Sequence, residues 1–387
     1  MSDYLHMRHG NDSQKEELMA LLNKTFGFTT DEEKFETLIP KLYNDEYHPA
    51  QNNIILDVNG EMRAAVGVYY GSFFVGDEKL KTAGIGNVAT HPDYQGEGYM
   101  KFCMALAMDE IKQSMADIAM LGGARQRYAH YGFEHGGAKY EFTYGQENVR
   151  RKFFCDKKSK FTAKLIEKTD KDILEKITEI YNSRIFKAER TTDTMYDILK
   201  TWNANPYAVF DGVEFKGWYV FNKETDCTFE LGFVNAEDIE DIVISALEIC
   251  GKKQFKISAA PFEIQLCKFL GLNCENYNII HSEMYNIMCY ENVIRAFLKL
   301  KSKFNKLNDG ECVLFIEGNK LHEQIKITVK DNNVTVCETD EKPDLALKHL
   351  DAMRLVAGLY SDRRNELPAA CASWFPLPIY VAPSDTV

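Results

Sequence analysis

Long apolar runs and an apolar leader are both missing from this 387-residue sequence. No stretch approaches the roughly 20 consecutive apolar residues that a membrane-spanning helix requires. The first ten residues, MSDYLHMRHG, lack the apolar core of a secretory signal. We therefore expect a cytoplasmic protein without a membrane partner.

Positive charge and paired cysteines are also scarce. Asp and Glu number 58 against 46 for Lys and Arg, which gives a formal net charge of −12. Because nucleic acids and anionic membranes are bound through positive fields, we expect neither as a partner, and a cationic substrate suits the chain better. The ten cysteines form no C-x-x-C pair, so we expect reduced thiols and no metal site.

What the sequence does contain is a glycine-bearing turn between an apolar strand and a helix, in residues 86–100 (GNVATHPDYQGEGYM). The first amides of a helix lack partners and carry partial positive charge, so they can converge on a phosphate. Gly96 and Gly98 let the backbone approach closely. The pattern predicts an anion site, although such turns also occur for packing alone. It lacks the Gly-Lys-Ser/Thr of a nucleotide triphosphatase and the acidic residue that a dinucleotide ribose needs.

This stretch resembles motif A of the GCN5-related N-acetyltransferase (GNAT) superfamily, whose loop has the form Gln/Arg-x-x-Gly-x-Gly/Ala. The resemblance implies that the loop amides bind the diphosphate of acetyl-CoA and that the preceding strand hydrogen-bonds the pantetheine through its backbone. The cofactor-binding residues would then be Asn87, Val88, Ala89, Gln95, Gly96, Glu97, Gly98, Tyr99 and Met100. Two of them depart from the motif. Met100 replaces a small residue, and the negative charge of Glu97 must point to solvent or weaken binding.

A second resemblance covers residues 125–133, RQRYAHYGF, which are similar to the Tyr-x-Arg-Phe-Gly-Tyr stretch of the enhanced intracellular survival (Eis) type of acetyltransferase. It implies that Tyr128 is the general acid that protonates the departing coenzyme A thiolate. A phenol with a pKa of about 10 is protonated at neutral pH and suits this role. The alternative is a core aromatic. His130 stands where the family has arginine, which leaves the role of that neighbour open.

The C-terminal segment 374–381, WFPLPIYV, is too apolar for a free tail, so we expect it to be docked. In Eis-type enzymes the terminal carboxylate enters the first domain and accepts the amine proton. The resemblance implies this role for the carboxylate of Val387. The alternative is that residues 381–387 only pack at an interface, with Ser384 and Asp385 solvated.

Hydrophobic periodicity and turn residues predict an α+β chain in three units. We expect helices over 13–26 and 30–43, a strand hairpin at Asn59-Gly60, a polar and basic linker at 146–160, and strands at 311–317, 322–330 and 333–338. The resemblance implies two tandem GNAT-like domains, each a mixed sheet flanked by helices, followed by a sterol-carrier-like α/β domain. Their expected boundaries are 1–148, 149–290 and 291–387.

The second unit lacks the glycine spacing and carries acidic residues where its corresponding helix begins, Glu237, Asp238, Glu240 and Asp241. These charges would repel a diphosphate, so we expect this unit to be catalytically empty and to wall the substrate cleft.

Together these features predict an N-acetyltransferase that uses acetyl-CoA as co-substrate, without a metal. It would transfer the acetyl group directly to a primary amine of a small cationic molecule or to a lysine side chain. The alternatives are an acyltransferase for a longer acyl chain and a non-catalytic acyl-CoA-binding or lipid-binding protein. The resemblance also implies a homo-oligomer such as a hexamer.

Overall fold

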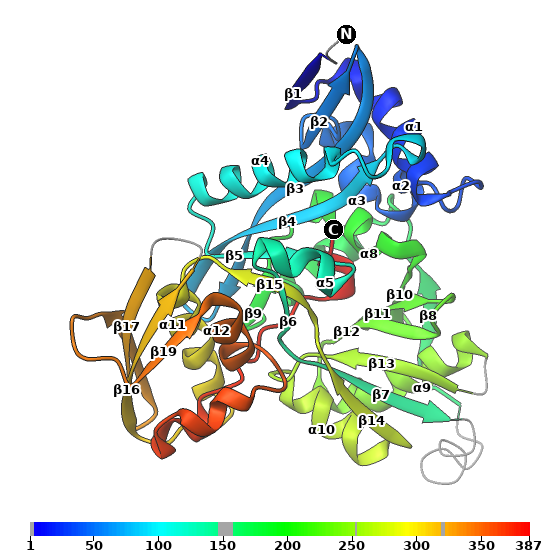
Figure 1. Cartoon of the computed structure of the whole chain (residues 1–387). Coiled ribbons are helices and arrows are strands. Elements are labelled where there is room, and N and C mark those ends of the chain that lie inside the picture. Colours follow the sequence, from blue (N-terminus) through cyan, green and yellow to red (C-terminus); the bar gives the residue numbers. More distant parts are fainter. Residues whose placement is uncertain (1–3, 146–157, 252–253, 319–321) are drawn as a thin grey trace.

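Three β-sheets organise the chain, and helices cover them (Figure 1). The structure is a computed structural model that describes residues 4–145, 158–251, 254–318 and 322–387. Most of the expected basic linker, and with it the boundary between 148 and 149, lies outside these residues. Within the described residues no helix is both long and apolar enough to span a bilayer.

The first sheet has one parallel strand pair within an otherwise antiparallel order. Its strands are β1 (Leu5–His9), β2 (Asn53–Val58), β3 (Glu61–Val75), β4 (Glu78–Thr90), β5 (Ile118–Leu121), β15 (Glu283–Ile287) and β6 (Glu134–Gly136), and β9 (Phe186–Ala188) pairs with the end of β3. The parallel pair is β4 with β5. The predicted Asn59-Gly60 hairpin is confirmed, because both residues have the positive φ that this tight turn needs.

Five helices accompany this sheet: α1 (Lys15–Phe26), α2 (Phe35–Leu38), α3 (Pro40–Tyr43), α4 (Tyr99–Gln113) and α5 (Arg125–Tyr128). The prediction of one helix over 30–43 was wrong, because the chain breaks into α2 and α3 at Ile39. Pro40 has no N–H to continue the helix and starts the next one at its first position.

The second sheet repeats the first in strand direction. Its order is β14 (Asn276–Ile280), β7 (Lys139–Gly145), β13 (Gln254–Ala259), β12 (Cys227–Phe233), β11 (Glu214–Asn222), β10 (Asn205–Asp211) and β8 (Thr162–Leu165). Its one parallel pair is β12 with β13. The helices of this unit are α7 (Lys171–Asn182), α8 (Thr192–Leu199), α9 (Ile239–Cys250) and α10 (Ile264–Asn273).

The two sheets exchange a strand, which sequence order did not predict. Strand β15 follows the second unit in sequence but lies between β5 and β6 in the first sheet. Strand β7 follows the first unit but lies between β13 and β14 in the second sheet. The expected range 1–148 therefore contains one strand of the second sheet, β7, and the expected range 149–290 contains two strands of the first sheet, β9 and β15.

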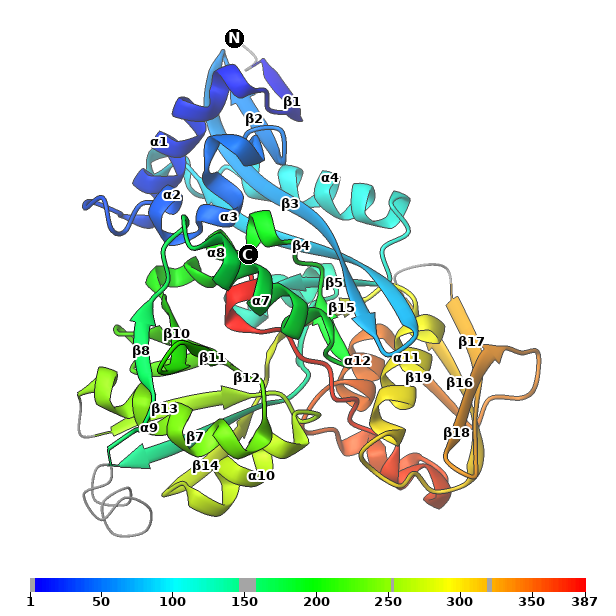
Figure 2. The ribbon, with the colours of Figure 1, turned by 180° about the vertical axis from the view of Figure 1, so that it is seen from behind.

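The third sheet has the order β18 (Asn333–Glu338), β17 (His322–Lys330), β16 (Gly310–Glu317) and β19 (Leu345–Lys348), with α11 (Tyr290–Ser302) and α12 (His349–Val356). The strands predicted at 311–317, 322–330 and 333–338 are confirmed. The docked C-terminal segment is also confirmed, because Trp374, Leu377 and Ile379 are fully buried in one core with this sheet. The chain then runs inward, and its end lies beside α7 and α8, below β4 (Figure 2).

Candidate active site

The site begins where β4 and β5 separate. Their parallel pairing runs only from Thr82 opposite Ile118 to Ile85 opposite Leu121. Directly beyond it, β4 carries a bulge, because two of its residues, Asn87 and Val88, lie between positions where β3 has one. The backbone at 87–89 is therefore not paired with β5, and a wedge opens between the two strands.

Asn87 holds this bulge with its side chain. Its φ is 38°, and its Oδ1 accepts hydrogen bonds from the hydroxyls of Tyr43 (2.6 Å) and Tyr69 (3.0 Å), while its Nδ2 donates to Asn53 Oδ1 (2.6 Å). Burial raises the pKa of Tyr69 to about 12, so this hydroxyl stays a donor. The side-chain amide of Asn87 is thus engaged in hydrogen bonds within the protein.

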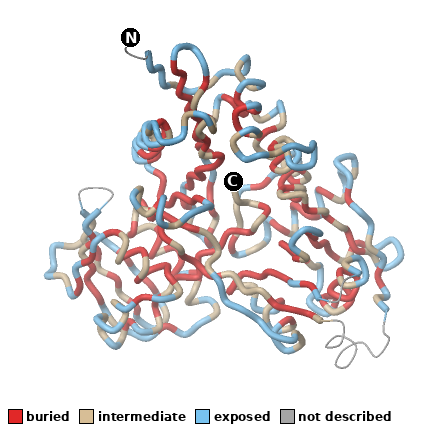
Figure 3. The backbone as a smooth tube through the Cα atoms, turned by 45° about the vertical axis from the view of Figure 1, so that its right-hand side comes forward, coloured by how far each residue is buried: buried red, intermediate tan, exposed pale blue. Residues whose placement is uncertain are grey.

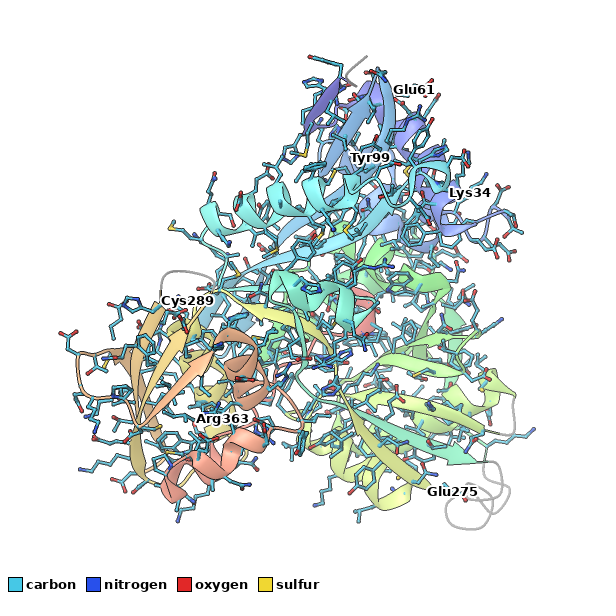
Figure 4. The ribbon with its side chains drawn as sticks, viewed as in Figure 1. Lys34, Glu61, Tyr99, Glu275, Cys289 and Arg363 are labelled. Atoms are coloured by element: carbon cyan, nitrogen blue, oxygen red, sulfur yellow. The ribbon has the colours of Figure 1, made fainter. Side chains whose placement is uncertain are left out.

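The glycine turn forms one side of a cavity of about 420 Å³. Six of the predicted cofactor residues line it, namely Val88, Gln95, Gly96, Gly98, Tyr99 and Met100. Gly96 (φ 97°) and Gly98 (φ 82°) have open space where a Cβ would project, and α4 begins directly after them at Tyr99 (Figure 4). The lining also includes two cations, Lys101 and Arg127.

The other predicted cofactor residues, Asn87, Ala89 and Glu97, do not line this cavity. Glu97 is exposed to solvent. Ala89 is fully buried on β4. The Tyr99 ring packs into the core under α4, which leaves its backbone at the helix start.

A second cavity, of about 430 Å³, adjoins the first and shares Val88 and Arg127 with it. Tyr128 and Val387 both line it, together with Asn87. Its other walls, which no sequence motif indicated, are mainly aromatic and apolar and include Phe26, Phe28, Phe35, Trp202 and the carboxyl of Glu283. The structure thus brings the two predicted catalytic residues into one cavity beside the predicted cofactor strand.

Tyr128 ends α5, which follows β5 after a turn. Its side chain is 5% exposed, and burial raises its pKa, against the opposing effect of the Arg127 guanidinium. The short helix is fastened through Arg125, which pairs with the buried carboxylate of Glu134. Arg354 of α12 donates to the same carboxylate (2.8 Å), so the third unit helps to fix the position of Tyr128.

Val387 lies directly on β4. A Cβ built on Gly84 would stand 2.8 Å from Val387 Cγ2, and one on Gly86 would stand 3.5 Å from its carboxyl carbon. These two glycines leave the space that the last residue occupies. The terminal carboxyl therefore lies in the Tyr128 cavity, against the strand that precedes the bulge.

Polar contacts from distant parts of the chain hold the residues before Val387. Trp202 Nε1 donates to Thr386 Oγ1 (2.9 Å), Lys41 Nζ donates to the carbonyl oxygen of Ser384 (2.6 Å), and Arg190 pairs with Asp385 (2.8 Å). The alternative in which Ser384 and Asp385 are solvated is wrong, because Ser384 is fully buried and the Asp385 side chain is 10% exposed.

Several of these residues had no local signal in the sequence. Trp202 and Arg190 come from the second unit, more than 180 positions before the tail residues they hold. Phe35 packs in a core cluster beside Tyr43, and it also lines the cavity. His130, the departure from the Eis-type stretch, is exposed and does not line this cavity.

Comparisons with known proteins agree with this geometry. Residues 6–136 match the family model described as acetyltransferase (GNAT) domain. The chain is similar to a GCN5-related N-acetyltransferase from Kribbella flavida (TM-score 0.69, 16% identity, covering 100% of this chain and 99% of the other). It is also similar to Eis1 from Mycobacterium abscessus (TM-score 0.63, 13% identity, 98% of each chain).

A probable N-acyltransferase from Enterococcus faecalis V583 gives a comparable match (TM-score 0.68, 16% identity, 99% of this chain and 98% of the other). At these identities the likeness concerns the fold. A search of curated protein sequences found no match. The family match and the splayed β4–β5 wedge lead to one assignment: residues 6–136 form an acetyltransferase domain of the GNAT family, within a chain whose whole fold resembles that of Eis1.

Proposed function

We propose that this protein is an acetyl-CoA-dependent N-acetyltransferase that acts by direct transfer on a primary amine. The observation that carries the proposal is the pair of adjoining cavities, which share Val88 and Arg127 and connect the glycine turn with Tyr128 and Val387. An extended cofactor bound along β4 would then present its reacting end to both proton-transferring groups.

The turn suits the diphosphate of acetyl-CoA. Gly96 and Gly98 leave room above the first amides of α4, whose helix start favours an anion. Lys101 and Arg127 add positive charge to the cavity lining, whereas Glu97 is exposed to solvent and does not line the cavity. The backbone at Asn87, Val88 and Ala89 is not paired with β5 and provides the edge that would hold the pantetheine.

The second cavity supplies the proton transfers. The cofactor brings an activated acetyl thioester. As the amine nitrogen bonds to the acetyl carbon and the carbon–sulfur bond breaks, the carboxylate of Val387 takes the amine proton and Tyr128 donates its proton to sulfur. Burial keeps the Tyr128 phenol protonated at neutral pH, which the acid role requires. Positioning of both groups in one cavity supports the rate.

The walls favour a cationic acceptor, either a small molecule or a lysine side chain. The aromatic faces of the cavity attract ammonium groups, and the Glu283 carboxyl adds a negative partner. Burial raises the pKa of Glu283, and a bound cation would oppose this effect and favour the ionised carboxylate.

We further propose that the second unit is a degenerate GNAT-like domain and that the third is sterol-carrier-like, in a cytoplasmic homo-oligomer such as a hexamer. The strand directions of the second sheet support the first part. In place of a glycine turn, the second unit has buried Asp238 and Asp241 at the start of α9, which disfavour a diphosphate there.

The test is release of free thiol from acetyl-CoA with a panel of aminoglycosides, polyamines and lysyl peptides. Turnover that depends on the amine and falls in Tyr128→Phe supports the proposal. Acetyl-CoA binding without turnover on any amine would favour a non-catalytic acyl-CoA-binding protein. Faster turnover with longer acyl-CoA thioesters would favour the alternative acyltransferase.

A further inference from the structure

A fully buried arginine connects the second unit with the end of the chain. Arg190 lies between β9 and α8, and its Nε and Nη2 donate to the two carboxylate oxygens of Asp385 at 2.9 and 2.8 Å. Its Nη2 also donates to Glu230 on β12 (2.8 Å), and its guanidinium stacks on the Tyr181 ring at 3.9 Å. This paired geometry fixes direction as well as distance.

Fold stability alone does not explain such a cluster. Taking a guanidinium and two carboxylates out of water is costly, and a buried ion pair often adds no more stability than well-packed apolar side chains. What the cluster does provide is a fixed position for one short piece of chain. Asp385 is two residues from the terminus, so holding it leaves only two residues of reach, roughly 7 Å at full extension.

The Arg190–Asp385 pair, called the clamp from here on, also separates the two carboxylates of the tail, those of Asp385 and Val387. Both oxygens of Asp385 are bonded to Arg190, and Asp385 lines a different cavity, of about 380 Å³, together with Tyr181 and Leu231. Val387 lines the Tyr128 cavity. The terminal carboxylate is therefore the one that the tail presents to Tyr128.

We propose that Arg190 is the positioning residue for the carboxylate of Val387: by clamping Asp385 it holds the terminal carboxylate at the place where it takes the proton from the amine. This inference rests on the proposed function. Trp202 and Lys41 each make a single hydrogen bond with the tail, whereas Arg190 forms a bidentate ion pair with Asp385.

The test compares Arg190→Gln, Arg190→Lys and the isosteric Asp385→Asn with wild type. Because a misplacement of about 1 Å can cost on the order of 10²-fold in rate, we expect kcat to fall 10- to 100-fold in Arg190→Gln. The KM for acetyl-CoA should stay within twofold, since the glycine turn is untouched. Arg190→Lys should recover part of kcat. Arg295→Gln, which removes an arginine paired on α11, is the matched control.

The pH profile of kcat gives a readout that a purely structural role would not move. The charged and titratable groups facing Asp385 are Lys41, Tyr181, Arg190 and Tyr380. Loss of the clamp should shift the acid limb of this profile, because the carboxylate of Val387 is then no longer held in place and becomes exposed to water. Folded Arg190→Gln with wild-type kcat and an unshifted acid limb would overturn the inference.

A second measurement does not depend on turnover. Carboxypeptidase should remove Val387 at least tenfold faster from Arg190→Gln and Asp385→Asn than from wild type, as followed by mass spectrometry. Equal release rates from folded proteins would refute the clamp. A wild-type protein that protects Val387 but acetylates no amine would instead refute the proposed function and leave the clamp standing.

Discussion

Substitution of Gly84 by alanine tests whether the position of the last residue limits catalysis. Gly84 lies on β4, and the three atoms nearest to its added methyl group all belong to Val387, at 2.8, 3.1 and 3.5 Å. Carbon atoms in contact prefer separations of about 3.5–4.0 Å, so the Val387 side chain must retreat by roughly 1 Å. The strain therefore falls on the tail.

A displacement of this size should lower kcat about 100-fold, which corresponds to about 2.7 kcal/mol in the activation barrier. The KM for acetyl-CoA should not change, because the turn at Gly96 and Gly98 lies elsewhere on the fold. The assay is thiol release at saturating acetyl-CoA, with thermal unfolding to show that Gly84→Ala remains folded.

A second substitution should reverse the effect. Val387→Ala removes the two Cγ atoms that clash and leaves the Cβ at 3.5 Å, an ordinary contact. The double variant Gly84→Ala/Val387→Ala should recover most of kcat, and Val387→Ala alone should stay active because the carboxyl group remains. Gly271→Ala on α10, whose methyl meets only a ring carbon of Phe142 at 3.5 Å, is the control. A folded Gly84→Ala with kcat within threefold of wild type would refute the reasoning.

Three further predictions follow from the site. Tyr128→Phe should lower kcat by about 10²-fold or more at every pH between 6 and 9. Acetyl-CoA binding, measured by calorimetry, should persist. An undiminished kcat would rule out Tyr128 as the general acid. Gly98→Ala and the control Gly251→Ala should each lower the free energy of unfolding by about 1–2 kcal/mol, because both glycines have a positive φ. Only Gly98→Ala should raise the KM for acetyl-CoA. Burial lowers the pKa of Lys41 to about 7, whereas an unburied lysine has a pKa of 10.5. Between these two pH values Lys41 carries a proton in the unfolded chain and lacks it in the folded chain. Urea denaturation should therefore show stability rising with pH more steeply in wild type than in Lys41→Met, and parallel curves would contradict this.

Features with a local cause could be predicted from the sequence. The Asn59-Gly60 hairpin follows from two residues that tolerate positive φ, and the strands of the third sheet follow from alternation between turn residues. The glycine turn was located because its function depends on residues adjacent in sequence. Tyr128 and Val387 were identified through a family resemblance, and the structure brings them into one cavity.

Features that depend on distant partners could not be predicted. The five residues Glu283–Ile287 mix polar and apolar side chains and do not indicate which sheet they join, so the exchange of β7 and β15 was not predicted. The same holds for Arg190, whose sequence neighbours give no hint that Asp385 is its partner. Phe35 lies in a stretch that was predicted as a helix, but nothing in its local sequence pattern indicates that it lines the cavity.

The strand exchange makes a final prediction, that residues 1–148 alone do not form a working acetyltransferase. In that fragment β5 would lose its antiparallel partner β15, β6 would lose its ladder with the same strand, and β7 would lack the second sheet. Unpaired, apolar edge strands favour aggregation over folding.

We expect the fragment to lack a cooperative thermal transition and to bind a dye that detects exposed apolar surface, whereas the full chain should show neither defect. A fragment that unfolds cooperatively and binds acetyl-CoA would contradict this. The active cavity also needs Trp202 from the second unit, the Arg354 contact from the third and the last residue of the chain. Its assembly should therefore require the whole chain, because each of these parts supplies a wall or an anchor that the others lack.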